Sequence, residues 1–519
     1  MNFQKDMTKI LWLFSALLFA LVLWVASPRG LGLTPDSVAY LKAVQGMING
    51  HGFSYFSVQW PPLYPSMVYL VSFLIGNDFF ASPRLLNAFL YGTAFLLTGV
   101  LLTKLMRHKK NWVISYVFAG LICLHPVITH IYFYVLSEAL FIPLVLINLI
   151  VLINYYEKIN ELTLKQSIFL SLLGSALIST RYAGVTLIAL NVFFILFSAK
   201  VPLFSKKIIF TSIQILPAFI ILKNWLGHVG VSDTDTNQRP LVWHPVTEAN
   251  MYDGLANIGS WILPVIHPNE SPLIRMSCLL LGSVAVIFLI LITIKSFFSI
   301  YTLRHNNSIT PSAGVVWIIS IFCMGYILFL VLVRSFIDPH IVFDSRFLSP
   351  IFIPIMTLPI YCATQISNRR VYMGGLVLIA LIYAMPVKQL RSWLLISYFN
   401  GIELNDKTRL NSKILQFVRE CPKNASVYAD NPWNFNLEFK SMVQWLPTYN
   451  FFGTGLPDPN YQTKLQTFSN DVDIVIVENI QSDVVIVMNK NTDFRQIYNQ
   501  SDGIVWYRIH STENCKNCK

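Results

Sequence analysis

Charged residues are scarce in this sequence. They make up 12% of its 519 residues, about half the share found in an ordinary soluble domain. Hydrophobic residues supply 54%, more than a soluble fold of this length could bury. A lipid bilayer accepts the apolar surface that water rejects. The shortage of charge therefore excludes a soluble globular protein and predicts a polytopic membrane protein.

The sequence also lacks the motifs of several enzyme and transporter classes. It contains no Walker A motif, no glycine-rich dinucleotide loop after a strand and no HExxH, so ATP-driven transport and zinc-protease chemistry have no support. Its seven cysteines are too few and too scattered for a disulfide framework. Cys515 and Cys518 form a single CxxC, which is a weak metal signal without a second pair of ligands.

Apolar runs that could cross a bilayer recur along the first 386 residues, and they predict about eleven spanning helices. The predicted spans are 10–26, 84–103, 112–130, 138–155, 166–179, 183–198, 208–223, 277–294, 315–333, 348–364 and 371–386. The first is interpreted as an uncleaved helix rather than a signal peptide, because its cleavage signature is poor. The fifth and sixth are short.

The net charge of +12 comes from basic residues at the ends of these runs. When the N-terminus is placed in the cytoplasm, every inside loop is basic, from Lys5 and Lys9 before the first span to Arg369 and Arg370 before the last. This alternation satisfies the positive-inside rule. The basic charge therefore indicates membrane orientation, and no nucleic-acid partner is expected. The expected location is a bacterial plasma (inner) membrane, crossed many times.

The outer segments carry their own predicted structure. In the first outer loop, 27–83, residues 37–48 and 63–75 predict amphipathic helices lying along the membrane surface. The tail alternates strand-like runs, such as 473–478 and 483–488, with polar turns. We therefore expect two domains, a membrane module at 1–386 and a small extracytoplasmic α/β domain at 387–519.

Four ionisable residues fall on the outer face. Asp36 begins the first outer helix and Glu138 begins the fourth span, where each could simply cap its helix. Arg181 lies between two short spans, where a charge is costly unless it is paired or solvated. Arg346 precedes the tenth span and could be an interface anchor.

The segments around these residues resemble the GT-C glycosyltransferases. Along the chain the sequence contains PDSVAYL, GHGF, PPLYP, SEALF, TRYAG, SRFLSPIFIP and GIVWYRI, in the order of that family's landmarks. The resemblance covers the whole chain and includes the aminoarabinose transferases and the protein O-mannosyltransferases. It implies an inverting transfer of a sugar from a polyprenyl-phosphate donor to a glycolipid, polysaccharide or protein acceptor on the outer face of the membrane.

The resemblance also implies roles for particular residues. Asp36 matches the catalytic acid of the family and would act as general base on the acceptor. Arginines suit a leaving group that is already an anion. The implied donor-phosphate contacts are Arg181, Arg346 and Arg84, and the implied supporting residues are Tyr40, His51, Tyr64 and Glu138.

Several family members carry a second acid right after the first, and here that position is Ser37, so a metal bridged by two adjacent carboxylates is not expected. No metal or other cofactor is therefore expected, and the lipid-linked sugar is a substrate. Two other functions stay open. A transporter or flippase of lipid-linked glycans would also have many spans, although it would be expected to show paired hydropathy repeats. A non-catalytic scaffold would tolerate replacement of Asp36 at a cost of about 1 kcal/mol for a lost cap.

Overall fold

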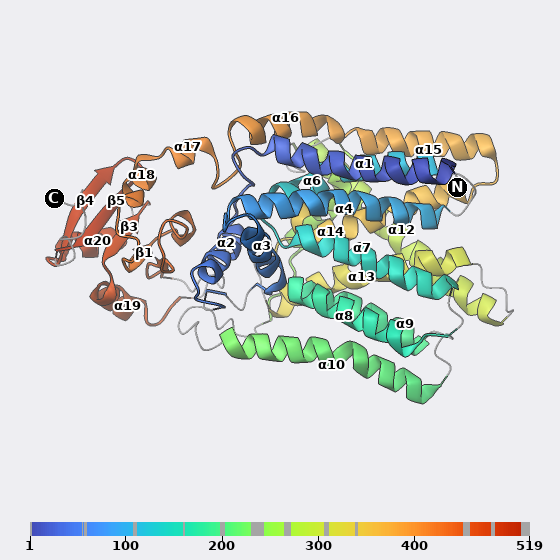
Figure 1. Cartoon of the computed structure of the whole chain (residues 1–519), viewed down its shortest axis with the longest axis horizontal. Coiled ribbons are helices and arrows are strands. Elements are labelled where there is room, and N and C mark those ends of the chain that lie inside the picture. Colours follow the sequence, from blue (N-terminus) through green and yellow to red (C-terminus); the bar gives the residue numbers. More distant parts are fainter. Residues whose placement is uncertain are drawn as a thin grey trace.

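The structure is a computed structural model in which a bundle of long helices joins a small sheet domain at one end (Figure 1). It describes residues 3–53, 55–56, 60–106, 112–158, 161–197, 203–229, 243–263, 271–305, 311–337, 341–449, 457–478 and 483–509. Cys515 and Cys518 lie outside these residues.

Within the described residues, eight helices are long and apolar enough to cross a membrane, or nine if one bent pair is counted as a span. These helices are α1 (Phe3–Ala26), α4 (Ala81–Leu105), α7 (Glu138–Lys158), α10 (Phe204–Val229), α12 (Pro272–His305), α13 (Pro311–Phe336), α14 (Ser345–Thr364) and the continuous α15–α16 segment (Arg369–Phe399). The bent pair is α5 (Trp112–Cys123) with α6 (Pro126–Phe133), which meet at 61°. The polytopic architecture is thus confirmed, whereas the count of eleven spans stays a prediction.

The two short predicted spans correspond to α8 (Leu164–Thr180) and α9 (Val185–Phe197). The helices of the bundle differ in how much of their surface is covered. About two thirds of the most apolar window of α4, α7 and α14 is buried (67% each), against 11% for α1 and 22% for α12. Exposed leucine, isoleucine and phenylalanine on the outer helices are suited to lipid rather than water. The central helices α7 and α14 begin with the predicted site residues.

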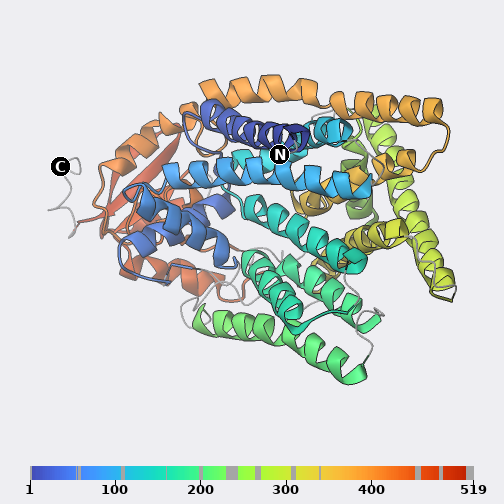
Figure 2. The ribbon, with the colours of Figure 1, turned by 45° about the vertical axis from the view of Figure 1, so that its right-hand side comes forward.

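The first outer loop forms the two predicted helices, α2 (Pro35–Ile48) and α3 (Leu63–Leu74). They lie between the end of the bundle and the sheet domain in both views (Figures 1 and 2). The exposed polar face implied by an amphipathic α2 is absent from its first half, because all residues from Ser37 to Val44 are buried. Its place along the membrane surface stays a prediction. The sheet domain covers the face of α2 that carries Lys42. This lysine is fully buried, and its Nζ donates to the carbonyl oxygens of Asn436 (3.1 Å) and Phe439 (2.5 Å).

The last span extends further than predicted. The helices α15 (Arg369–Ala384) and α16 (Val387–Phe399) together form one apolar segment of 31 residues. The domain boundary that we predicted at residue 387 falls inside this segment. Beyond Pro386 the chain stays apolar, with Leu394, Leu395 and Ile396 in α16, so the apolar segment continues to Phe399. The first helices of the sheet domain are α17 (Lys407–Leu410) and α18 (Lys413–Arg419).

The sheet has five strands in the order β2-β1-β3-β5-β4. They are β1 (Val427–Ala429), β2 (Gln444–Trp445), β3 (Ile474–Val477), β4 (Phe494–Gln500) and β5 (Gly503–Arg508). The strand β1 pairs in parallel with β2 and β3, while β5 is antiparallel to β3 and β4. The other helices of this domain are α19 (Tyr461–Thr467) and α20 (Asp483–Lys490).

One strand prediction holds and one fails. Residues 473–478 contain β3, as expected. Residues 483–488 belong to the helix α20 instead. Val484 and Met488 are buried four residues apart, which is helical spacing, while Ile486 between them is 58% exposed. The run is short and almost entirely apolar, and such a run does not distinguish a strand from a helix by its sequence pattern.

Candidate functional site

The structure brings the four predicted outer-face residues into one connected cluster. Arg181 Nη1 lies 2.6 Å from Glu138 Oε1, and Arg346 Nε donates to the same oxygen at 2.8 Å. The other edge of the Arg346 guanidinium, Nη2, pairs with Asp36 Oδ2. The cluster is therefore a chain of alternating charge, Asp36–Arg346–Glu138–Arg181. We call these four residues the charged cluster.

Each member of the charged cluster is placed by the end of a different helix. Asp36 is the second residue of α2, Glu138 the first residue of α7, Arg181 the residue after α8 and Arg346 the second residue of α14. The N-terminal ends of α2 and α7 suit the carboxylates of Asp36 and Glu138, and the C-terminal end of α8 suits Arg181. Arg346 lies at the N-terminal end of α14, so it depends on these two carboxylates instead. Four such ends meeting at one side of the bundle concentrate charge where no single helix would.

Local turns fix the two arginines. Asp344 caps α14 by accepting a hydrogen bond from the Phe347 N–H at 2.9 Å. Arg181 lies in an extended conformation between α8 and the short turn that contains Gly184. A Cβ at Gly184 would lie 2.5 Å from backbone atoms of α8, so the glycine of TRYAG lets the chain fold back closely. The ring of Phe347 lies under both guanidinium groups, 5.8 Å from Arg181 and 5.5 Å from Arg346.

Asp36 is not a helix cap. Thr34 caps α2 through a reciprocal pair with Ser37, whose Oγ accepts from the Thr34 N–H at 3.0 Å while Thr34 Oγ1 accepts from the Ser37 N–H at 3.3 Å. The capping alternative for Asp36 is therefore wrong, and its carboxylate is directed to Arg346. Ser37 occupies the position where several members of the family carry a second acid. Its hydroxyl group takes part in the cap of α2.

Glu138 is the centre of the cluster, a role that the sequence did not reveal. Its side chain has no exposed surface, whereas Arg181 is 14%, Arg346 24% and Asp36 27% exposed. A buried carboxylate needs partners for its charge, and here two arginines supply them. Glu138 therefore positions the arginines, while Asp36 and Arg346 form the accessible end that a substrate can reach.

Ser137 was also missed, although it precedes Glu138 in SEALF. Its Oγ donates to Glu138 Oε2 (3.3 Å) and accepts from the hydroxyl of Tyr40 (3.0 Å) and from Arg181 Nη1 (3.2 Å). Tyr40, predicted as a supporting residue, therefore reaches the cluster through Ser137. Burial raises the pKa of the Tyr40 phenol, with Asp36 and Glu138 adding to the shift, so Tyr40 remains a neutral donor at physiological pH.

The other predicted site residues lie outside the charged cluster. Tyr64 donates to Asn87 Oδ1 (3.1 Å) and packs its ring against Tyr40. The imidazole of His51 packs against the ring of Tyr55 at a centroid distance of 5.3 Å. Arg84 donates to Ser27 Oγ (3.2 Å) and stacks on Trp24. In the described part of the chain, no hydrogen bond or ion pair joins His51 or Arg84 to the cluster.

The arrangement does not resemble a metal centre. Among the described residues, no group of three or more histidine, cysteine, aspartate or glutamate side chains could hold an ion. Asp36 and Glu138 are both turned toward Arg346, and the charges of the two carboxylates are balanced by Arg346 and Arg181 together. The residues present therefore do not fit a bound divalent ion, and the expectation that none is required stays a prediction.

Comparison with known proteins identifies the fold. No family model and no curated protein matches the sequence. Among solved structures, ArnT from Cupriavidus metallidurans in the apo state is 12% identical, with 96% of this chain and 98% of that chain covered and a TM-score of 0.50. The same enzyme bound to undecaprenyl phosphate is 13% identical, with the same coverage and TM-score.

The archaeal oligosaccharyltransferase AglB from Archaeoglobus fulgidus, in complex with an inhibitory peptide and a dolichol-phosphate, is 10% identical. There 99% of this chain and 75% of that chain are covered, with a TM-score of 0.50. At such low identity the likeness concerns the fold alone. The chain has a GT-C-like fold, as its sequence landmarks predicted.

Proposed function

We propose that this protein is a membrane glycosyltransferase that moves a sugar, with inversion, from a polyprenyl-phosphate-linked donor to a glycolipid, polysaccharide or protein acceptor. The observation that carries the proposal is the partly exposed Asp36–Arg346 pair, backed by the buried Glu138 and Arg181. The GT-C-like fold supports it, since two of the proteins that share the fold bind undecaprenyl phosphate and dolichol-phosphate.

The proposed chemistry needs a base and a cation, and the pair supplies one of each. The bond between the anomeric carbon and the phosphate oxygen breaks, and its electrons stay on the polyprenyl phosphate. Arg346 and Arg181 stabilise that charge through planar donors that match phosphate oxygens. The acceptor hydroxyl attacks the anomeric carbon from the opposite side, and its proton passes to the Asp36 carboxylate.

The Asp36–Arg346 contact suggests how the two roles are separated in time. In the free protein each residue neutralises the other. In the proposed mechanism the donor phosphate takes the place of Asp36 at the Arg346 guanidinium, and the released carboxylate can then accept a proton. Glu138 keeps Arg346 in place during this exchange through the contact with Nε.

The proposed orientation follows the charge pattern of the sequence. The N-terminus lies in the cytoplasm of a bacterial inner membrane, and the charged cluster and the sheet domain lie on the outer face. About eleven spans give this arrangement if α5–α6, α8 and α9 each cross the membrane. The sheet domain then covers α2, which carries Asp36, through the contacts of Lys42.

The decisive experiment follows the lipid product. The purified protein in nanodiscs is incubated with a panel of polyprenyl-phosphate sugars and candidate acceptors, and free polyprenyl phosphate is measured by mass spectrometry. Wild type is expected to release it and Asp36→Asn to release at least about 100-fold less, with Asp253→Asn, a partly exposed aspartate outside the cluster, as matched control. Equal release by wild type and Asp36→Asn would contradict the role of Asp36. No release, together with movement of the intact donor across the bilayer, would favour a flippase.

A further inference from the structure

A cavity of about 400 Å³ lies beside the first residues of the outer loop, next to the start of α4. Separate parts of the chain line it: residues between 28 and 33 with Leu41 and Val135, the start of α4 with the residues before it, and Asn405, Leu410 and Arg419 at the sheet-domain end. Its volume falls in the range of small-molecule sites, about 300–1,000 Å³. It shares no residue with the charged cluster.

Arginines dominate the charge of this cavity. Arg29, Arg84 and Arg419 line it, together with one carboxylate, Asp78. Arg419 is already paired with Glu438, at 3.1 Å. The Asp78 carboxylate is also engaged, since its Oδ1 accepts from the N–H groups of two residues at the start of α4, at 2.8 and 2.9 Å.

The remaining two arginines are held in place by neutral groups. Arg29 Nε donates to the Phe399 carbonyl oxygen at 2.9 Å. Arg84 donates to Ser27 Oγ and to the Trp24 carbonyl oxygen, and its guanidinium lies 3.9 Å from the centre of the Trp24 ring. Among the described residues neither has a carboxylate within ion-pair distance. The cavity therefore presents two fixed positive charges that lack a counter-ion.

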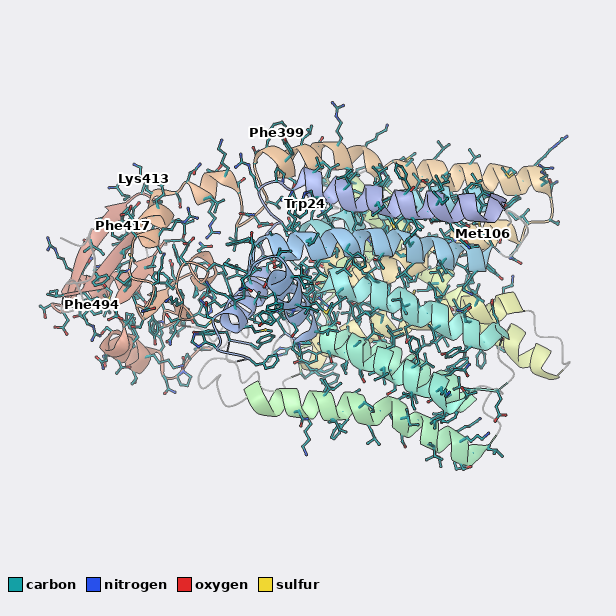
Figure 3. All side chains as sticks on the ribbon, in the orientation of Figure 1. Trp24, Met106, Phe399, Lys413, Phe417 and Phe494 are labelled. Atoms are coloured by element: carbon teal, nitrogen blue, oxygen red, sulfur yellow. The ribbon has the colours of Figure 1, made fainter. Side chains whose placement is uncertain are left out.

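The cavity lies beside the ends of two apolar helices. The apolar stretch of α1 ends at Ala26 and that of α4 begins at Ala81, so the helix ends beside the cavity mark one edge of the membrane region. Trp24 (38%), Phe80 (46%) and Phe399 (59%) are exposed around it, as expected for aromatic residues at a membrane interface. Figure 3 shows Trp24 and Phe399 at the end of the bundle that faces the sheet domain.

We propose that this cavity binds the phosphate group of an anionic membrane lipid, with Arg29 and Arg84 as the main contacts. Planar guanidinium groups match phosphate oxygens, and basic pockets at the membrane surface bind anionic headgroups. Because residues of the bundle, the first outer loop and the sheet domain all line the cavity, the bound lipid links the three. Arg84 is thereby assigned to a lipid site separate from the proposed donor site.

The test uses the full-length protein, delipidated in a neutral detergent, and native mass spectrometry. Short-chain phosphatidylglycerol, short-chain phosphatidylcholine and inorganic phosphate are titrated separately. Wild type is expected to bind phosphatidylglycerol at least about tenfold more tightly than the other two, because only this ligand combines an uncompensated phosphate with a membrane anchor. Equal binding of phosphatidylcholine would overturn the proposal. Equal binding of inorganic phosphate would overturn its lipid part.

Variants then locate the site. Arg29→Gln, at an exposed position, and the double variant Arg29→Gln/Arg84→Gln are expected to weaken phosphatidylglycerol binding by about tenfold and more than tenfold, respectively. The exposed Arg495→Gln in β4 is the matched control. Asp36→Asn is expected to bind phosphatidylglycerol like wild type. Wild-type affinity in a folded Arg29→Gln protein, or lost binding in Asp36→Asn, would overturn the assignment.

Discussion

Arg346 joins Asp36 to Glu138: its Nε donates to Glu138 Oε1 at 2.8 Å while its Nη2 pairs with Asp36. One planar guanidinium thereby connects an accessible carboxylate with a fully buried one. A lysine could not do this, because its single ammonium lacks the two-sided geometry of the guanidinium. The relationship separates the two acids by role, since Glu138 fixes the arginine and only Asp36 can exchange with a substrate.

Loss of the Glu138 charge is expected to be the most damaging single change in the cluster. Glu138→Gln leaves Arg181 and Arg346 without their shared counter-charge in a buried place. Removing one partner of a buried ion pair costs about 3–5 kcal/mol. Thermal unfolding in detergent should therefore show a clear loss of stability beside the loss of sugar transfer. Asp36→Asn is the comparison, and equal melting of the two variants would contradict a central role of Glu138.

Replacement of Thr34 and of Asp36 should affect different properties. Thr34→Ala removes the cap of α2 and should cost about 1 kcal/mol of stability. Asp36→Asn leaves that cap intact, so it should cost less stability than Thr34→Ala and yet abolish turnover. Melting temperature and turnover measured side by side test this. The opposite order of the two melting temperatures would show that Asp36 has a structural role instead.

Lys42 predicts a pH dependence of stability. Burial lowers its pKa from 10.5 to about 8, although Gln45 Oε1 and the carbonyl oxygens of Asn436 and Phe439 accept its hydrogen bonds. Between pH 8 and 10.5 the unfolded chain binds more protons at this group than the folded protein does, so its contribution to stability becomes more favourable as the pH rises.

Lys42→Met removes this titration. The melting temperature of wild type relative to Lys42→Met should increase between pH 8 and pH 10, and other titrating groups cancel in the comparison. Parallel pH profiles for the two proteins would show that the pKa of Lys42 is not lowered in the folded state.

The absence of a second acid after Asp36 predicts activity without a metal. Turnover of the lipid-linked donor should be unchanged in an excess of chelator, because the arginines and not an ion stabilise the leaving phosphate. A loss of turnover in chelator that a divalent ion restores would contradict this expectation. The melting temperature in chelator serves as the control for indirect effects on folding.

Much of this architecture follows from local sequence. The runs of apolar residues predicted the membrane helices, because a span must satisfy its backbone within one continuous segment. The strand β3 and the helices α2 and α3 were likewise predictable from short windows. Asp36, Glu138, Arg181 and Arg346 could be selected because each is a charge at the end of an apolar run, where charge is costly unless it is paired or solvated, and because the segments around them resemble landmarks of one family.

The tertiary structure alone decided how these residues pair. Asp36 and Arg346 are 310 residues apart in sequence, and no local pattern specifies which of two carboxylates an arginine contacts. Burial by distant segments decided the rest: the sheet domain covers Lys42 on α2, and the arginines that follow α8 and begin α14 make Glu138 the centre of the cluster. Hydropathy and capping act over a few residues, so the sequence by itself determined the helices and their charged ends. Ion pairing and burial depend on chain segments that only the fold brings together, so the tertiary structure determined the site.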